Sequence, residues 1–356
     1  MGNEVENICK SIFYDLENHK SELISLFAEE SHYNIEDIER LWIDLSEYIN
    51  KFPIFYENKL NNWKNEEGFY NQWRPGTSFL HLPWGKVLIC ISSNSVIPLL
   101  PIFILSFCCL SNSVVISPSR RTMKTAERIF NIIKNNSEVK LWNIFLFKEG
   151  GQAAIAKYVS NRDVDLLFFQ GSSKNRNEIY QKCIENSVDI IFEGEGNPIV
   201  FIDFKKSNQA LSNLLSDFFR YNLFCNGQLC TTPRFIFCKK ENLNNISGIS
   251  EVVLEDIESF NFDSENSGLK IYYFSNINQL HRVLKENKFG LQISIFSDHN
   301  ELEVFVLRYG KVGRITVNRN PLDQNSLLPW GGYKISGYSK VSDFLEKATK
   351  TVIVEK

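Results

Sequence analysis

The sequence lacks the features that mark several large classes of protein. Its 356 residues contain no Cys-x-x-Cys pair and no His-Glu-x-x-His motif, so the common zinc-site spacings are absent and we expect no metal. The 39 basic residues do not exceed the 42 acidic ones, which argues against a nucleic-acid binder. The eight cysteines are scattered rather than arranged as a disulfide framework, and the first twenty residues are too polar for a signal peptide. These observations favour the cytoplasm.

The sequence also lacks a hydrophobic run of membrane-spanning length. Residues 87–119 carry no charge, but their unbroken apolar part, 96–110, has only 15 residues. A bilayer requires about 20 residues. This stretch also contains Pro98 and Pro101, and it is flanked by serines and asparagines. The pattern therefore predicts a strand, a loop, a buried helix and a second strand in place of a membrane span.

What is present is enough apolar material for a large core, 43% of residues with 28 Phe and 13 Tyr. Residues 1–70 have a helical pattern, and from residue 85 apolar strand patterns alternate with helical ones. The expected strands are 86–91, 113–116, 141–147, 164–169, 198–204, 235–238, 271–274, 291–296 and 350–355, and the expected helices between the first four are 98–110, 122–135 and 151–159. Polar residues 241–269 are expected to be loops around one short element. This alternation predicts an α/β protein with parallel sheets.

One segment, Phe224–Arg234, carries a candidate nucleophile. Cys230 follows Asn226-Gly227-Gln228-Leu229 at a turn between an expected helix and an expected strand. A glycine permits a tight turn, and a cysteine at such a turn is expected to have a lowered thiol pKa. The alternative is that Cys230 is a small buried apolar residue, as most cysteines in reduced proteins are.

Five segments in order resemble the aldehyde dehydrogenase superfamily from about residue 81 onward. They are Pro83-Trp84-Gly85, Val114–Ser119, Phe169-Gln170-Gly171-Ser172-Ser173, Asn226–Cys230, and Val317-Asn318 with Pro329–Gly337. The resemblance implies an α/β fold with a Rossmann-type cofactor domain and a smaller, here shortened, α/β catalytic domain. The implied division is a helical region at 1–80, an NADP-binding domain at 81–192, a catalytic domain at 193–330, and a C-terminal segment at 331–356 whose last strand returns to the cofactor domain or to a partner subunit.

The resemblance also implies roles for particular residues. Cys230 would be the nucleophile, and Asn94 would donate to the oxyanion unless it only caps the following helix. The residues implied to bind the cofactor are Ser92, Ser117, Ser119, Arg120, Arg121, Gly171 and Ser172. Ser117 stands where the family commonly has a lysine, and the following Arg120-Arg121 pair suits the 2′-phosphate of NADPH. The alternative is that both arginines are solvated residues at the start of a helix.

The sequence differs from the family pattern at the position of the general base. Ungapped alignment from Asn197-Pro198 places Phe192 at the position of the family's catalytic glutamate, and a shifted loop would instead supply Glu193 or Glu195. Cys230-Thr231-Thr232-Pro233-Arg234 is similar to the acyl-CoA reductase branch, as in the fatty-acid reductase of luminous bacteria.

We therefore expect NADPH-dependent reduction of an acyl thioester, donated by acyl-CoA or an acyl-carrier protein, through an acyl-cysteine. The alternatives are an aldehyde dehydrogenase that uses Glu193 or Glu195 as base, and a degenerate homologue that only binds. The strand-forming 350–355 segment suggests a homo-oligomer, a dimer or a tetramer.

Overall fold

The structure is a computed structural model that describes residues 2–204, 208–243, 254–260, 269–322, 326–337 and 341–355. The chain divides into two compact units. Unit 1 comprises Met1–Phe192, Asn325–Trp330 and Ser342–Lys356, and unit 2 comprises Glu193–Gln324 and Gly331–Val341. The main boundary therefore falls between Phe192 and Glu193, two neighbours whose roles the sequence left open.

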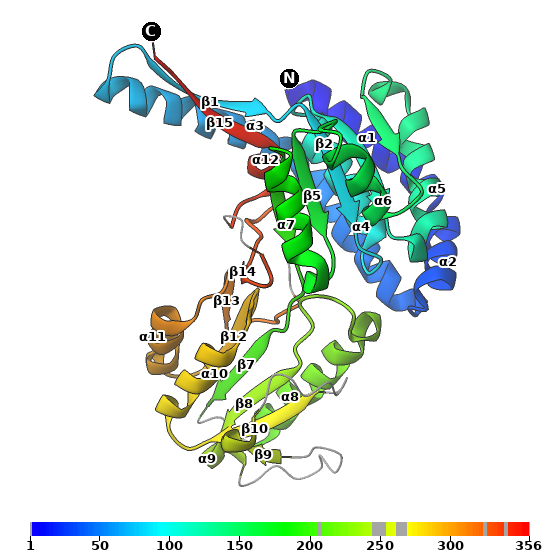
Figure 1. The fold of residues 1–356 in the computed structure, drawn as a ribbon. Coiled ribbons are helices and arrows are strands. Elements are labelled where there is room, and N and C mark those ends of the chain that lie inside the picture. The colour runs from blue at the N-terminus through cyan, green and yellow to red at the C-terminus, as the bar shows by residue number, and fades with distance from the viewer. Residues whose placement is uncertain are drawn as a thin grey trace. The chain divides into compact units, whose positions relative to one another are not determined.

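Unit 1 is built on a five-stranded sheet of order β4-β3-β2-β5-β6, of which Figure 1 labels the strands β2 and β5. The strands are β2 (Lys86–Ile91), β3 (Ser113–Pro118), β4 (Ile144–Leu146), β5 (Leu166–Gln170) and β6 (Asp189–Glu193). The pairs of β2 with β3 and β5, and of β3 with β4, are parallel, which confirms the predicted βαβ pattern. The chain runs outward from β2 to β4 and then returns to the other side of β2. The switch point of this topology therefore lies between β2 and β5.

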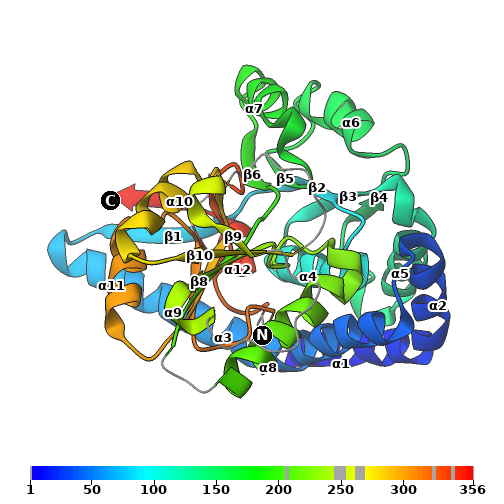
Figure 2. The same ribbon diagram turned by 90° about the horizontal axis from the view of Figure 1, so that it is seen from below.

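Helices cover both faces of this sheet, as Figure 2 shows. One face is packed by α4 (Val96–Cys108) and α5 (Met123–Asn135), and Phe103 of α4 contacts Phe168 of β5 at 4.8 Å between ring centroids. The other face is packed by α6 (Gly151–Ala154), a π-helical turn at Ile155–Val159, and α7 (Arg176–Glu185). No helix in the described ranges is both long and apolar enough to cross a membrane. The apolar run is thus a buried helix between strands, as predicted.

Three N-terminal helices and a two-stranded ribbon complete unit 1. The helices are α1 (Gly2–Asn18), α2 (Lys20–Ser31) and α3 (Ile35–Trp73), and the ribbon pairs β1 (Thr77–Pro83) antiparallel with β15 (Thr349–Glu355). A short helix, α12 (Phe344–Lys347), precedes β15, and Lys59 of α3 fixes it through ion pairs with Asp343 (2.6 Å) and Glu346 (2.5 Å). The last strand thus returns to β1.

Unit 2 contains a six-stranded sheet of order β13-β12-β7-β8-β10-β9. Its strands are β7 (Ile199–Asp203), β8 (Phe235–Lys239), β9 (Leu254–Asp256), β10 (Lys270–Phe274), β12 (Gln292–Ser297) and β13 (Arg314–Val317), all paired in parallel. Helix α8 (Asn208–Leu223) packs on one face, and α10 (Leu280–Glu286) and α11 (Asn300–Tyr309) pack on the other. Short α9 (Lys240–Leu243) follows β8, and β11 (Phe289–Gly290) pairs with β14 (Tyr333–Lys334).

The largest shortening of a predicted strand is at residues 141–147. The strand expected at 141–147 is formed only by β4, because residues 141–143 lie in a turn where the Leu141 side chain is exposed. Much of the polar stretch 241–269, where loops were expected, lies outside the described residues.

Candidate active site

The turn that carries Cys230 has an unusual backbone. After α8, Cys225 (φ 49°), Asn226 (φ 54°) and Gly227 (φ 66°) are all left-handed. A left-handed non-glycine residue costs about 1–3 kcal/mol, so this turn is held by its surroundings. Two observations favour glycine at position 227. Its φ is positive, and a Cβ there would lie 2.8 Å from the Asn222 carbonyl oxygen. The Asn222 side-chain amide donates to the Pro233 carbonyl oxygen at 3.0 Å and closes the loop around Cys230.

A second segment of unit 2 runs directly against this turn. A Cβ on Gly196 would lie 2.0 Å from the Cys230 carbonyl oxygen, so Gly196 passes where no side chain fits. Glu193 lies three residues before this contact and is only 5% exposed. The Cys230 turn and the Glu193 loop therefore form one packed site within unit 2.

The chemistry of Cys230 differs from the expectation of a lowered pKa. Although part of the residue remains exposed, burial and the negative charge of Glu193 raise the pKa of the Cys230 thiol to about 12. A carboxylate repels a thiolate and disfavours loss of the thiol proton. The prediction of a lowered pKa was therefore wrong, because the thiol is buried and the negative charge of Glu193 adds to the effect of burial.

Phe192 and Glu193 lie in different surroundings. Neighbouring residues on a strand point to opposite faces. Phe192, at the end of β6, is fully buried in the core of unit 1 and stacks on Phe169 at 5.2 Å between ring centroids. Glu193 acts on the Cys230 thiol, whereas the Glu195 residue is exposed. Of the two predicted carboxylates, Glu193 therefore remains the candidate base beside Cys230.

In unit 1 the predicted residues gather at the switch point of the sheet. The Ser92 hydroxyl, after β2, lies 2.6 Å from Asn94 Oδ1 and 3.1 Å from Gln170 Oε1 at the end of β5. Ser95 Oγ also donates to Asn94 Oδ1 at 3.1 Å. Because the Ser92 and Ser95 hydroxyls lie at Oδ1 of Asn94, the hydrogen-bond donor of this side chain is Nδ2. Gln170 was not assigned a role from sequence, although it lies within a recognised motif.

The predicted cofactor residues at the end of β3 and just after it differ in whether their side chains have hydrogen-bond partners. Ser117 Oγ is buried and has no hydrogen-bond partner among the described residues. Ser119 Oγ accepts from the Arg121 backbone N–H at 3.3 Å and caps the next turn. Arg120 donates through Nε (3.0 Å) and Nη2 (2.6 Å) to the Glu149 carbonyl oxygen. The Arg121 guanidinium is exposed and finds no hydrogen-bond partner in the described ranges.

The remaining two predicted residues follow β5. A Cβ on Gly171 would come within 3.1 Å of the Phe169 ring, so this position requires a small residue. Ser172 Oγ accepts from the Lys174 backbone N–H at 3.2 Å and caps the 3₁₀ turn before α7. Both residues therefore have local structural reasons in addition to the predicted contact with a pyrophosphate.

These residues fit a dinucleotide cofactor. In open parallel sheets such ligands bind at the carboxyl ends of the strands, at the switch point. The orphaned Ser117 hydroxyl at the end of β3 is a buried polar group that still needs a hydrogen-bond partner, which a ribose hydroxyl would provide. Asn94 and the cofactor residues lie in unit 1, and Cys230 and Glu193 lie in unit 2. Among the described residues, no three His, Cys, Asp or Glu side chains group as a metal site.

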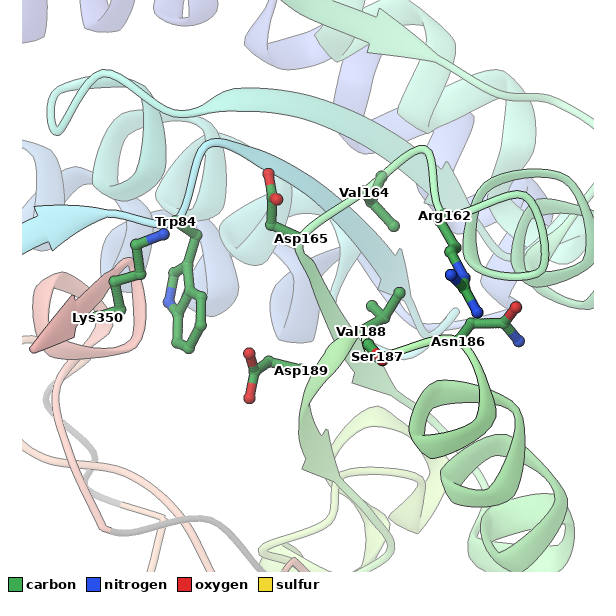
Figure 3. Close-up of a pocket in the computed structure, with 9 residues that line it drawn as sticks. All are labelled: Trp84, Arg162, Val164, Asp165, Asn186, Ser187, Val188, Asp189 and Lys350. Atoms are coloured by element: carbon green, nitrogen blue, oxygen red, sulfur yellow. The ribbon is translucent and has the colours of Figure 1, made fainter.

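A separate pocket of about 280 Å³ lies at the opposite edge of the unit 1 sheet (Figure 3). Trp84 precedes β2, Asp165 precedes β5 and Asp189 begins β6, so this pocket lies at the amino ends of the strands. Asp165 Oδ2 accepts from the Lys86 backbone N–H at 2.8 Å and fixes the start of β2. The pocket contains none of the predicted site residues, and its position is not where a parallel sheet binds a dinucleotide.

Comparisons with known proteins identify the family and the fold. The aldehyde dehydrogenase family profile matches residues 3–263. Aldehyde dehydrogenase 21 from Physcomitrella patens is similar in structure, with a TM-score of 0.81 and 14% identity over 99% of this chain and 86% of that one. Aldehyde dehydrogenase from Bartonella henselae is similar with a TM-score of 0.80 and 14% identity, over 100% of this chain and 87% of that one. Betaine aldehyde dehydrogenase from Staphylococcus aureus is similar with a TM-score of 0.77 and 16% identity, over 99% of this chain and 82% of that one.

The search of curated proteins finds no match. The structural likeness, at these identities, shows the fold, and the profile match covers more than half of the chain. The fold is thus the predicted aldehyde dehydrogenase-like α/β fold, in a shortened form. The chain belongs to the aldehyde dehydrogenase family, whose oxidoreductases use NAD(P).

Proposed function

We propose that this protein oxidises an aldehyde to an acid with NADP, through a covalent bond to Cys230. The observation that carries this proposal is the contact of the Glu193 loop with the Cys230 turn, where a Cβ on Gly196 would lie 2.0 Å from the Cys230 carbonyl oxygen and where the Glu193 charge helps to raise the thiol pKa. The expected thioester reduction is favoured if Phe192 replaces the general base, because the acyl-enzyme then escapes hydrolysis. The burial of Phe192 in unit 1 and the effect of the Glu193 charge on the Cys230 thiol support Glu193 as a carboxylate that activates water.

In the first half-reaction the Cys230 sulfur bonds to the aldehyde carbon as the thiol proton passes to solvent, and Glu193 stays a carboxylate. The carbonyl electron pair moves onto oxygen, where the Asn94 amide and the Cys230 backbone N–H would donate hydrogen bonds. The nicotinamide of the cofactor, when bound, supplies the hydride acceptor. Loss of hydride from the former aldehyde carbon restores the carbonyl and leaves a thioester on Cys230.

In the second half-reaction Glu193 accepts a proton from water as the water oxygen bonds to the thioester carbon. The carbon–sulfur bond then breaks, the acid leaves, and Cys230 recovers its proton. A positioned base of this kind contributes about 10²–10⁴-fold to a rate.

The second candidate is the reduction of an acyl thioester to an aldehyde with NADPH. It is favoured by the resemblance of Cys230-Thr231-Thr232-Pro233-Arg234 to the acyl-CoA reductases. In this reaction Cys230 displaces CoA or a carrier-protein thiol, and hydride from NADPH reduces the acyl-cysteine. The resulting thiohemiacetal releases aldehyde. The chemistry uses the same sulfur, but it needs no hydrolytic base.

The direction of turnover separates the two candidates. Rates would be measured with aldehydes plus NADP and with acyl-CoAs plus NADPH, over a range of chain lengths. Oxidation with release of free acid supports the proposal, and thioester reduction without hydrolysis supports the second candidate. In the first case Glu193→Gln should leave an acyl adduct on Cys230, detectable by intact mass. The same substitution should speed alkylation of Cys230 at fixed pH, because loss of the negative charge lowers the thiol pKa.

We also propose that a second copy of this chain covers the β1–β15 ribbon. Figure 1 shows this ribbon beside the end of α3. Exposed apolar side chains gather on these elements, namely Phe69, Tyr70, Trp73, Leu82 and Ile353. In the described residues the ribbon has two strands only, so its edges carry unpaired backbone groups that a second ribbon or sheet edge would satisfy. A smaller oligomer of Ile353→Lys by light scattering would support this proposal, and a monomeric wild type would refute it.

A further inference from the structure

We propose that Ser336 is a positioning residue that holds the Glu193 loop against the nucleophile. The inference rests on the proposed function of Glu193 as the base that activates water. Ser336 does not touch the reacting atoms, and it acts through the loop that carries Glu193. Ser336, Glu193 and Cys230 all lie in unit 2.

The contacts of Ser336 join three segments that are far apart in the sequence. Its hydroxyl donates to the Glu195 carbonyl oxygen at 2.6 Å and accepts from the Gly290 N–H at 3.1 Å. Its own carbonyl oxygen accepts from the Gly194 N–H at 2.8 Å. The Ser336 residue is fully buried, so solvent offers no replacement for these bonds. Glu193 itself forms an antiparallel bridge with the next residue, Gly337.

The Glu193 loop needs such an anchor because of its sequence. Gly194 and Gly196 flank Glu195, and glycine loses more conformational freedom on ordering than any other residue. Ser336 fixes the loop through the backbone of Gly194 and Glu195. On its other side the loop meets the turn, where Gly196 packs on the Cys230 carbonyl oxygen. The loop that carries Glu193 is therefore held between Ser336 and the Cys230 turn.

Ser336 has little freedom to move. A Cβ on Gly332 would lie 2.8 Å from the Ser336 Cβ, and a Cβ on Gly290 would lie 2.4 Å from the Tyr333 carbonyl oxygen. The backbone of β14 thus lies directly on β11, with which it pairs. This packing fixes the Ser336 hydroxyl at the position where it bridges the loop to Gly290.

Ser336→Ala tests this role, with Ser294→Ala as the matched control. Ser294 is also fully buried in unit 2, and its hydroxyl also makes two bonds, to Thr316 Oγ1 (2.8 Å) and Gln292 Nε2 (3.2 Å). Both substitutions remove a buried hydroxyl and should lower thermal stability similarly. Only Ser336→Ala should slow hydrolysis of the acyl-enzyme, by about tenfold, the effect of losing about 1.4 kcal/mol of positioning.

The decisive readouts follow Glu193 rather than stability. Ser336→Ala should accumulate an acyl adduct on Cys230 and should speed iodoacetamide labelling of Cys230 at pH 8, with labelling of the other seven cysteines unchanged. The adduct and the labelling rate should both increase, as they do in Glu193→Gln, but by less. Equal behaviour of Ser336→Ala and Ser294→Ala would overturn the inference.

Two further outcomes have a fixed meaning. If Ser336→Ala does not fold, Ser336→Cys keeps the volume with a weaker hydrogen-bonding group, and unchanged acyl-enzyme hydrolysis in that variant overturns the inference. If Glu193→Gln itself hydrolyses the acyl-enzyme at the wild-type rate, the proposed function fails first. A slow Glu193→Gln with a wild-type-like Ser336→Ala removes only the role of Ser336.

Discussion

The switch point of unit 1 and the Cys230 turn of unit 2 are built in different ways. At the switch point, side-chain hydrogen bonds among Ser92, Asn94 and Gln170 arrange the loops. At the Cys230 turn, backbone approaches at Gly196 and Gly227 leave no room for a Cβ. A lost side-chain bond weakens a site by a limited amount, whereas a blocked backbone approach displaces a segment. We therefore expect graded effects of substitution in unit 1 and severe ones in unit 2.

Cys230→Ala should give the largest effect and abolish both turnover and adduct formation. The thiol is the atom that bonds to substrate, so no neighbouring group replaces it. Intact mass after incubation with an aldehyde and NADP, or with an acyl-CoA alone, measures the adduct. Cofactor binding, followed by quenching of tryptophan fluorescence, should be retained.

Cys238→Ala is the matched control for this substitution. Cys238 is also in unit 2, fully buried in β8, and its removal leaves the Cys230 turn unaltered. This variant should lose stability and keep its adduct on Cys230. An adduct that persists in Cys230→Ala, on any cysteine, would mean that the nucleophile is misassigned.

Asn94→Ala should lower kcat by about 10²–10³-fold, the usual effect of removing one oxyanion donor. Cofactor affinity should change little, because Asn94 Oδ1 is the partner of two serines and Nδ2 is its donor end. Steady-state rates and cofactor titration measure the two quantities separately. A variant with normal kcat would limit Asn94 to arranging the loop before α4.

Gly196→Ala should show whether the contact with Cys230 is as tight as the geometry indicates. The added Cβ would lie 2.0 Å from the Cys230 carbonyl oxygen and 2.4 Å from Leu291 Cδ2, so the loop must move. Overpacking of this kind costs about 1–3 kcal/mol of stability. Thermal unfolding should occur at a lower temperature, and turnover should fall more than stability alone explains. Gly68→Ala, in α3 with nothing near its Cβ, is the control and should be neutral or stabilising.

The fold could be predicted because its determinants are local. Alternating apolar strands and helices, such as 86–91 followed by the helix from Pro98, specify parallel βαβ units without knowledge of distant contacts. The family resemblance implied that the last strand returns to the cofactor domain or to a partner subunit, but its pairing with β1 could not be predicted, since it joins residues more than 260 positions apart with no local signal.

The site was predicted less completely, for physical reasons. Cys230, Asn94 and the β3 loop were predicted from motifs, but the raised pKa of Cys230 comes from burial and from a carboxylate 37 residues away in sequence, and the local sequence shows neither. The choice between Phe192 and Glu193 depended on a one-residue register. On a strand, such a register decides which side chain enters the core and which faces the site.

Arg121→Ala should give the smallest of these effects, and it tests cofactor choice. Arg120 already donates to the Glu149 carbonyl oxygen, whereas the exposed Arg121 guanidinium has no hydrogen-bond partner in the part of the chain that the structure describes. Arg121→Ala should weaken NADPH binding by roughly tenfold and leave NADH binding unchanged, because only NADPH carries the 2′-phosphate. Arg120→Ala is the control and should disturb both cofactors equally through the Glu149 loop. Added salt should reduce the preference for NADPH of the wild type, since an exposed charge is screened. Equal affinity of the wild type for the two cofactors would assign Arg121 to the protein surface.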